Sequence, residues 1–521
     1  MKKGSGILLH VSSLPSRYGI GTFGKEARKF VRFLNAAHQK YWQILPLNPT
    51  SYGDSPYQSF SAFALNPYFI DLDYLQKRGY LTKEDLKTLR KTRMNRFVDY
   101  GYIYSTRFDI LRKASKKAYE VEPNKIPNFY KREKSWLRDY ALFMTIKGLQ
   151  DGLAFTSWPR DLRLHKKAAL AEIENNYKED VDFWIYTQYE AFRQYKSLRK
   201  YAHRRGIEII GDMPIYVAAD SADVWGNALI FMLDREHKAT DVAGVPPDYF
   251  SEDGQLWGNP LYDWDKMEKT KYKWWKKRFR KMASLYDYVR IDHFRAFDTY
   301  YSIKAGATTA KVGEWKNGPG IKFFDEVLKA APKLNVIAED LGDLADSVYE
   351  LMKQTGFPGL KVYQFAFSDY KECLEAEEDE EVFRNVDRSK LTHKKYKELK
   401  LINPFLPHHY VDNCVAYIGT HDNDVLKSYL ENHPEEHPYM MDYLGLYEPH
   451  HIYDTMIGSL MRSSAGVVIF TPQDLLRLGG ETRMNTPGKA DGNWRFRVLR
   501  NELSEGLASW VAIMTDEAHR N

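Results

Sequence analysis

The stretch YVRIDHFRAF, residues 288–297, begins as an apolar, β-branched run and ends in charged residues. Seven other short runs follow the same pattern, and helix-like sequence comes after each of them. They are ILLHVSSL (7–14), YWQILPL (41–47), IEIIGDMPIYV (207–217), NVIAEDL (335–341), LKVYQFAF (360–367), CVAYIGTHD (414–422) and GVVIFTPQDL (466–475). Near-continuous apolar strands that alternate with helices predict a parallel sheet covered on both faces. Eight such units predict an α/β fold closed into a (β/α)₈ TIM barrel.

The intervals between these strands are unequal, and they predict where a single barrel spanning residues 1–521 carries extra structure. Residues 49–180 separate the second strand from the helix before the third, far more than a normal connection. A capping-box pattern at Thr82 predicts that this insertion is a mostly helical subdomain. A second insertion is predicted at residues 218–284. Its loop GVPPDYFSEDGQLWGNPLYDW, from Gly244, is predicted to be a lid over the active site.

The composition excludes several classes of protein. The 76 basic and 70 acidic residues give a net charge of only +6, without the basic stripe of a nucleic-acid-binding protein. Two cysteines are too few for a disulfide framework or a four-ligand zinc site, which favours a reducing, cytoplasmic location. No signal-peptide cleavage site and no run of about twenty apolar residues is found, so no membrane span is predicted.

Four acidic residues end predicted strands, where the functional groups of such a barrel lie: Asp212, Asp292, Glu339 and Asp422. Like charges that converge on one barrel mouth would cost stability unless they had a use. Because side chains alternate along a strand, Arg290 points to the same face as Asp292. The guanidinium is expected to hold the pKa of Asp292 low, as a nucleophile requires. From this motif alone, a structural ion pair is an equally good interpretation.

Glu339 ends an apolar strand whose surroundings predict a raised pKa, the property of an acid that protonates a glycosidic oxygen. An ionised Asp beside a protonated Glu matches the two-carboxylate chemistry of glycoside cleavage. Neighbouring strands lie about 4.7–4.9 Å apart, which is closer to the carboxyl gap of retaining enzymes, roughly 5–5.5 Å, than to the inverting gap. The segment THDND at Thr420 lacks the further ligands of a metal site, so we predict no metal and no cofactor.

Motifs along nearly the whole chain carry a specific resemblance. Besides RIDHFRAF and the lid loop, they are HVSSLPS from His10, YGDSPYQSFSAFALNP from Tyr52, IGDMPIYVAADSADVW from Ile210, IAEDLG from Ile337, GTHDND from Gly419 and PQDLLRLGGETRMNTPG from Pro472. In these segments the sequence resembles the 4-α-glucanotransferases, or amylomaltases, of glycoside hydrolase family 77 in the α-amylase clan.

The resemblance implies that Asp292 is the nucleophile, Glu339 the acid/base and Asp422 the stabiliser of the transition state. It also implies a set of residues that bind maltooligosaccharides and other α-1,4-glucans. They are Ser55, Tyr57, Asp212, Tyr249, Phe250, Gln255, Trp257, Arg290, His421 and Asn485. Two alternatives use the same residues: an α-amylase-type hydrolase, and a glycan-binding barrel without catalysis.

Overall fold

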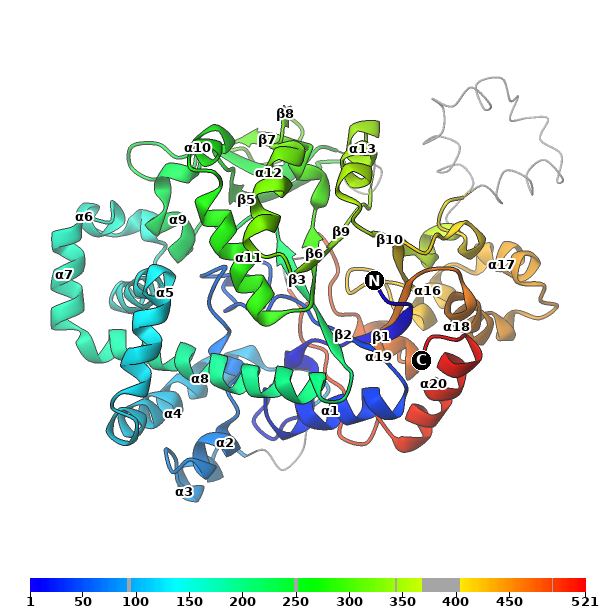
Figure 1. Cartoon of the computed structure of the whole chain (residues 1–521), viewed down its shortest axis with the longest axis horizontal. Helices are drawn as coiled ribbons and strands as arrows, with labels where there is room; N and C mark the ends of the chain where they lie inside the picture. The colour runs from blue at the N-terminus through cyan, green and yellow to red at the C-terminus, as the bar shows by residue number, and fades with distance from the viewer. Residues whose placement is uncertain (91–94, 248–251, 343, 368–402, 490) are drawn as a thin grey trace.

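The computed structural model describes the chain except residues 91–94, 248–251, 343, 368–402 and 490. Eight parallel strands form one sheet in the order β10-β11-β12-β1-β2-β3-β6-β9 (Figure 1). They are β1 (Gly4–Leu8), β2 (Tyr41–Gln43), β3 (Glu208–Pro214), β6 (Tyr288–Asp292), β9 (Asn335–Ala338), β10 (Gly359–Val362), β11 (Cys414–Tyr417) and β12 (Val467–Phe470). All eight predicted runs contribute a strand, so the predicted (β/α)₈ barrel is confirmed.

Several of these strands are shorter than predicted. The run at residues 7–14 becomes a short 3₁₀ helix at Val11–Ser13, and the runs at 288–297 and 360–367 end in 3₁₀ helices at Phe294–Phe297 and Tyr363–Ala366. The apolar side chains beyond the strands are buried all the same. The hydrophobic pattern therefore continues into loops at the barrel mouth and does not mark where the strands end.

Helices cover the sheet. In α1 the apolar side chains of Ala27, Phe30, Val31 and Leu34 are buried on one face of the helix. The C-terminal helix α20 packs against α1 (Figure 1). Except for α19, which follows the last strand, the remaining helices lie between strands along the chain. The set is α1 (Lys25–Ala36), α8 (Lys178–His203), α11 (Lys273–Leu285), α12 (Gly320–Val327), α13 (Asp346–Thr355), α16 (Leu426–Asn432), α17 (His437–Leu444), α18 (Ile452–Arg462), α19 (Pro472–Leu475) and α20 (Glu505–Glu517).

The segment predicted as a helical insertion, residues 49–180, holds several helices on one side of the sheet (Figure 1). The predicted capping box starts α3: Thr82 Oγ1 accepts the Asp85 amide at 3.2 Å, and the Asp85 carboxylate accepts the Thr82 amide at 2.8 Å. The helices are α2 (Leu72–Lys77), α3 (Lys83–Lys87), α4 (Tyr100–Val121), α5 (Lys125–Leu149), α6 (Arg160–Arg163) and α7 (Lys167–Asn176).

The second predicted insertion, residues 218–284, contains strands as well as helices. After α9 (Ala222–Gly226), an antiparallel sheet forms in the order β5-β4-β7-β8, from β4 (Asp241–Val245), β5 (Gln255–Pro260), β7 (Thr299–Lys304) and β8 (Glu314–Asn317). The helix α10 (Trp264–Lys269) follows β5. Two of these strands come from the connection after β6, which was not predicted to carry an insertion.

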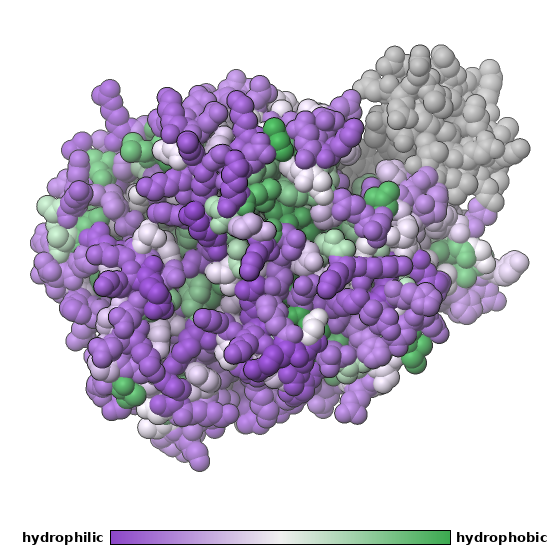
Figure 2. All heavy atoms as spheres, in the orientation of Figure 1, coloured by the Kyte–Doolittle hydropathy of each residue, from purple (hydrophilic) through white to green (hydrophobic). Residues whose placement is uncertain are grey.

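The surface shown in Figure 2 is mainly hydrophilic, and its hydrophobic residues lie in small separate groups. Among the helices that the structure describes, none is long and apolar enough to cross a membrane.

Candidate active site

Arg290 is the centre of the predicted site. It lies near the end of β6, is only 3% exposed, and contacts carboxylates from three neighbouring strands. Its Nη1 donates to Asp212 Oδ2 at 2.8 Å and to Asp292 Oδ1 at 3.0 Å, and its Nη2 lies 3.0 Å from Glu339 Oε2. Asp212 is itself buried. One planar guanidinium thus holds three carboxylates together, which its fork of donors allows and an ammonium does not.

The strand register explains why Asp292 and Glu339 meet. The strands β6 and β9 pair in parallel, with Ile291 opposite Ala338, and the Glu339 amide donates to the Ile291 carbonyl at 3.1 Å. Asp292 and Glu339 are the next residues on each strand, at their carboxyl ends. The strands that lead to Asp292 and Glu339 are therefore neighbours in the barrel, as the predicted pair of carboxyl groups requires. The side chains of Asp292 and Glu339 are 28% and 20% exposed, so a ligand can reach both.

The predicted order of the two carboxyl pKa values is wrong. Burial and the negative charge of Glu339 raise the pKa of Asp292 well above its usual value, although Arg290 opposes this. Burial alone would raise the pKa of Glu339 too, but Arg290 and a hydrogen bond from the His293 amide, 2.7 Å long, hold it below its usual value. The sequence pattern assigned Arg290 to Asp292 alone, whereas the guanidinium is shared. Burial and charge around this pair therefore favour protonation of Asp292 over protonation of Glu339.

Tyr57 joins the β3 side of the site to the β11 side. Its hydroxyl donates to Asp212 Oδ2 at 2.7 Å and lies 2.8 Å from His421 Nε2, and its ring stacks on His421 with centroids 5.5 Å apart. Ser55 accepts the Tyr57 amide through Oγ at 3.2 Å and so orders this segment. Trp494, which was not predicted, tilts against both rings.

Asp422 is held from two sides but keeps an open face. Its Oδ2 lies 3.2 Å from His421 Nε2, and its Oδ1 accepts the Asn485 side-chain amide at 2.6 Å. Arg483, which was also not predicted, donates to the main-chain carbonyl of Asp422. The Asp422 side chain is 37% exposed, so it remains available to a ligand.

The lid loop is described only in part, because Tyr249 and Phe250 lie outside the described residues. Trp257 on β5 lies with its ring 4.8 Å from the His293 ring, next in sequence to Asp292. Its indole N–H donates to Gln255 Oε1 at 3.2 Å. The described end of the predicted lid therefore packs against His293, the residue that follows Asp292.

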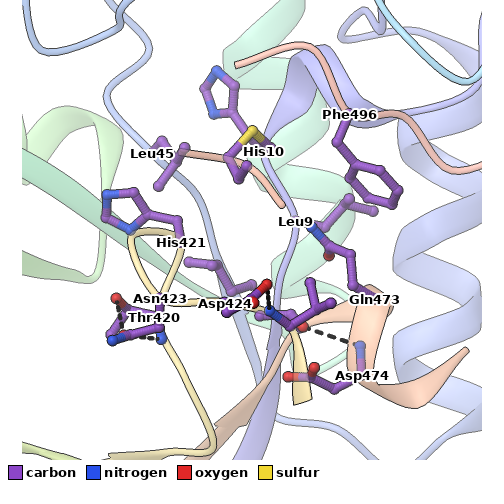
Figure 3. Close-up of a pocket in the computed structure, with 14 residues that line it drawn as sticks. Leu9, His10, Leu45, Thr420, His421, Asn423, Asp424, Gln473, Asp474 and Phe496 are labelled. Atoms are coloured by element: carbon purple, nitrogen blue, oxygen red, sulfur yellow. Dashed lines mark hydrogen bonds between the residues drawn. The ribbon is translucent and has the colours of Figure 1, made fainter. Parts of the chain in front are cut away.

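The turn after β11 lines part of a small pocket, with the side chains of Thr420, His421, Asn423 and Asp424 (Figure 3). Within the turn, Asn423 Oδ1 accepts both the amide and the hydroxyl of Thr420 at 2.8 Å, so the segment is braced by its own side chains. His10 lines the pocket, is 5% exposed, and has a ring Nδ1 without a hydrogen-bond partner. Burial and the nearby His421 lower the pKa of His10 to about 3, so it is neutral.

Comparisons with known proteins agree with this geometry. The family model described as 4-alpha-glucanotransferase matches residues 9–502. A 4-alpha-glucanotransferase of Clostridium butyricum is 43% identical over 97% of this chain and 99% of its own length, and one of Thermus thermophilus is 43% identical over 99% and 98%. The amylomaltase of Streptococcus agalactiae, solved in complex with acarbose, is 37% identical, covers 100% of both chains and superposes with a TM-score of 0.91. The chain therefore belongs to the 4-α-glucanotransferase family, glycoside hydrolase family 77.

Proposed function

We propose that this 4-α-glucanotransferase moves a segment of an α-1,4-glucan to the 4-hydroxyl of an acceptor glucose or glucan by double displacement with retention. The observation that carries the proposal is the carboxyl pair of Asp292 and Glu339, held on adjoining strand ends by the one guanidinium of Arg290. A nucleophile and an acid/base on one linkage are what retaining cleavage requires. Maltooligosaccharides are the expected substrates, and the cytoplasm the expected location.

In the first step Asp292 attacks the anomeric carbon of the donor. The bond from that carbon to the glycosidic oxygen breaks, and Glu339 gives its proton to the departing oxygen. In the second step the Glu339 carboxylate takes the proton of an acceptor 4-hydroxyl, and the new alkoxide displaces Asp292. The two inversions restore the α configuration.

Attack requires Asp292 ionised and Glu339 protonated, the reverse of the distribution favoured by burial and charge around the pair. A glycosidic oxygen that accepts a hydrogen bond from Glu339 would favour the reactive distribution. Binding of the donor and activation of the pair are then one event.

Other predicted residues would hold sugar hydroxyls. We expect these contacts from Asp422, which lies beside His421, and from Tyr57, whose hydroxyl is held by Asp212. Bonds from Asp422 that strengthen as positive charge develops on the sugar would accelerate the step, whereas equal binding of substrate and transition state would not. Trp257 beside the pair would exclude water from the glycosyl-enzyme, so that an acceptor sugar reacts in its place.

Maltotriose distinguishes the transferase from both alternatives. Chromatography of the products should show glucose together with chains longer than maltotriose, whereas a hydrolase yields only shorter sugars and a binding protein yields none. Asp292→Asn should abolish product formation and retain glucan binding measured by calorimetry. Activity that survives this substitution would remove Asp292 from the role of nucleophile.

A further inference from the structure

The barrel has one seam without a regular ladder, between β9 and β10. Among the described residues, one main-chain bond crosses it, from the Ala338 amide to the Pro358 carbonyl at 2.9 Å. In a parallel pair this bond is normally returned two residues later, here from the Leu360 amide to the Ala338 carbonyl. The Leu360 amide donates instead to Asp340 Oδ1, at 2.6 Å. The carboxylate of Asp340 takes the place of a main-chain acceptor.

The carboxylate of Asp340 occupies the space that a side chain at position 359 would need, and residue 359 is a glycine. A Cβ built at position 359 would lie 2.3 Å from Asp340 Oδ2 and 2.7 Å from its carboxyl carbon. No side chain larger than hydrogen fits there while Asp340 stays in place. The seam is therefore built around one side chain, and that side chain belongs to the residue that follows Glu339.

We propose that Asp340 is a positioning residue for Glu339, rather than only a closing bond of the barrel; this rests on the proposed role of Glu339 as acid/base. The main chain at Glu339 is anchored toward β6 by its own amide on the Ile291 carbonyl, at 3.1 Å. Toward β10 the next anchor is the bond from Leu360 to Asp340. The peptide that carries the acid/base is thus held between two strands, and loss of Asp340 frees one side of it.

The charged and titratable groups that act on Asp340 come from three strands: Glu339 from its own, Lys361 from β10 and Cys414 from β11. Burial raises the pKa of Asp340 to about 6, and the Leu360 amide and Lys361 oppose this rise. Both forms of the carboxyl keep an oxygen that can accept the Leu360 amide. The seam is therefore expected to hold across the working pH range, and the test does not depend on titration of Asp340.

The experiment compares Asp340→Ala and Asp340→Asn with Asp287→Asn in the full chain. Asp287 is a matched control because its carboxylate also accepts a strand amide, that of Ile209 at 2.8 Å, but just before β6, at the opposite end of the strands. We expect Asp340→Ala to lower kcat for maltotriose transfer by as much as about 100-fold, the effect of misplacing a catalytic group by roughly 1 Å. KM should change far less. Asp340→Asn, which keeps an acceptor oxygen, should lose less than Asp340→Ala, and Asp287→Asn should lower Tm with little change in kcat.

A donor whose leaving group needs no proton isolates the action through Glu339. With α-maltosyl fluoride, single-turnover fluoride release should be restored toward the wild-type rate in Asp340→Ala, as in Glu339→Gln. Gly359→Ala, which displaces the carboxylate without removing it, should lower kcat alone but add little to Asp340→Ala in the double variant.

Three results would overturn the proposal: kcat of Asp340→Ala within about 2-fold of wild type, an equal kcat loss in Asp287→Asn at matched Tm, or a fluoride rate as impaired as the maltotriose rate. Full maltotriose activity in Glu339→Gln would instead refute the proposed acid/base. The two failures are therefore distinguishable.

Discussion

Replacement of Arg290 by Met tests the electrostatic design of the site. The guanidinium lies 3.0 Å from an oxygen of Asp292 and 3.0 Å from one of Glu339, so the charge centres are separated by about 4 Å. At an effective dielectric of about 20, each pair is worth at most about 4 kcal/mol. Both carboxylates are partly exposed, at 28% and 20%, so the loss of either attraction should raise the carboxyl pKa by less than this limit implies.

The sign follows from the charge. Loss of the cation disfavours both carboxylates, so the pKa of Asp292 and that of Glu339 both rise. Attack needs an ionised nucleophile and a protonated acid, and both limbs of the bell-shaped profile of kcat/KM should therefore move to higher pH. Initial rates of glucose release from maltotriose, measured at closely spaced pH values, give both limbs.

Arg278→Met is the matched control. Arg278 is equally buried, at 3% exposed, but donates to the main-chain carbonyls of Pro214 and Ile215. Its loss should lower Tm and leave both limbs in place. Arg290→Lys, which keeps the charge without the fork, should shift the limbs less than Arg290→Met. A folded Arg290→Met variant with wild-type limbs would refute the electrostatic reasoning.

Three further predictions concern the lid, the pocket and the C-terminus. Trp257→Ala should raise the ratio of hydrolysis to transfer severalfold, because the ring beside His293 would no longer exclude water; an unchanged ratio in the products of maltotriose would contradict this. Folded His10 has a pKa of about 3 against 6.5 for the free side chain, so the unfolded state binds the extra proton as pH falls through 6.5. Between pH 6.5 and 5 the free energy of unfolding, measured by denaturant titration, should fall by about 2 kcal/mol more in the wild type than in His10→Phe. If the free energies of the two proteins fall equally with pH, this prediction is wrong. Arg520 is fully buried and donates to five main-chain carbonyls, among them those of Gly4 and Met461. Arg520→Ala should cost about 3 kcal/mol or more by thermal unfolding with normal kcat; a Tm equal to that of the wild type would count against this role.

The barrel was predictable from the sequence because parallel strands buried on both faces read as apolar runs. The antiparallel sheet was not. Its edge strand β8 reads EWKN and is largely exposed, so it has no apolar run to detect. In β4, Gly244 lets a main-chain oxygen of the neighbouring strand come within 2.3 Å of where a Cβ would lie, and a glycine in a loop-like stretch gives no strand signal.

The carboxylates of the site were predictable because they end strands, but their proton distribution was not. It depends on the His293 amide, which donates to Glu339 from a residue in the left-handed region, with φ of 53°. It also depends on the contact of the Arg290 guanidinium with Glu339 on the neighbouring strand. Trp494 and Arg483 lie in irregular segments far along the chain from Asp422. No periodicity marks such residues, and only the fold brings them to the site.

The guanidinium of Arg290 contacts both Asp292 and Glu339, and this arrangement suits a transferase better than a guanidinium that contacts the proposed nucleophile alone. In the proposed cycle the leaving group of the first step and the acceptor of the second are both sugar 4-hydroxyls, so Glu339 would have to give a proton and take one back with equal ease. An acid held strongly protonated by apolar walls would favour the first step and hinder the second. Arg290 and the His293 amide oppose the effect of burial and hold the pKa of Glu339 below its usual value, which favours the carboxylate that the proposed second step uses. The arrangement that contradicted the sequence-based expectation therefore fits a reversible transfer between like alcohols.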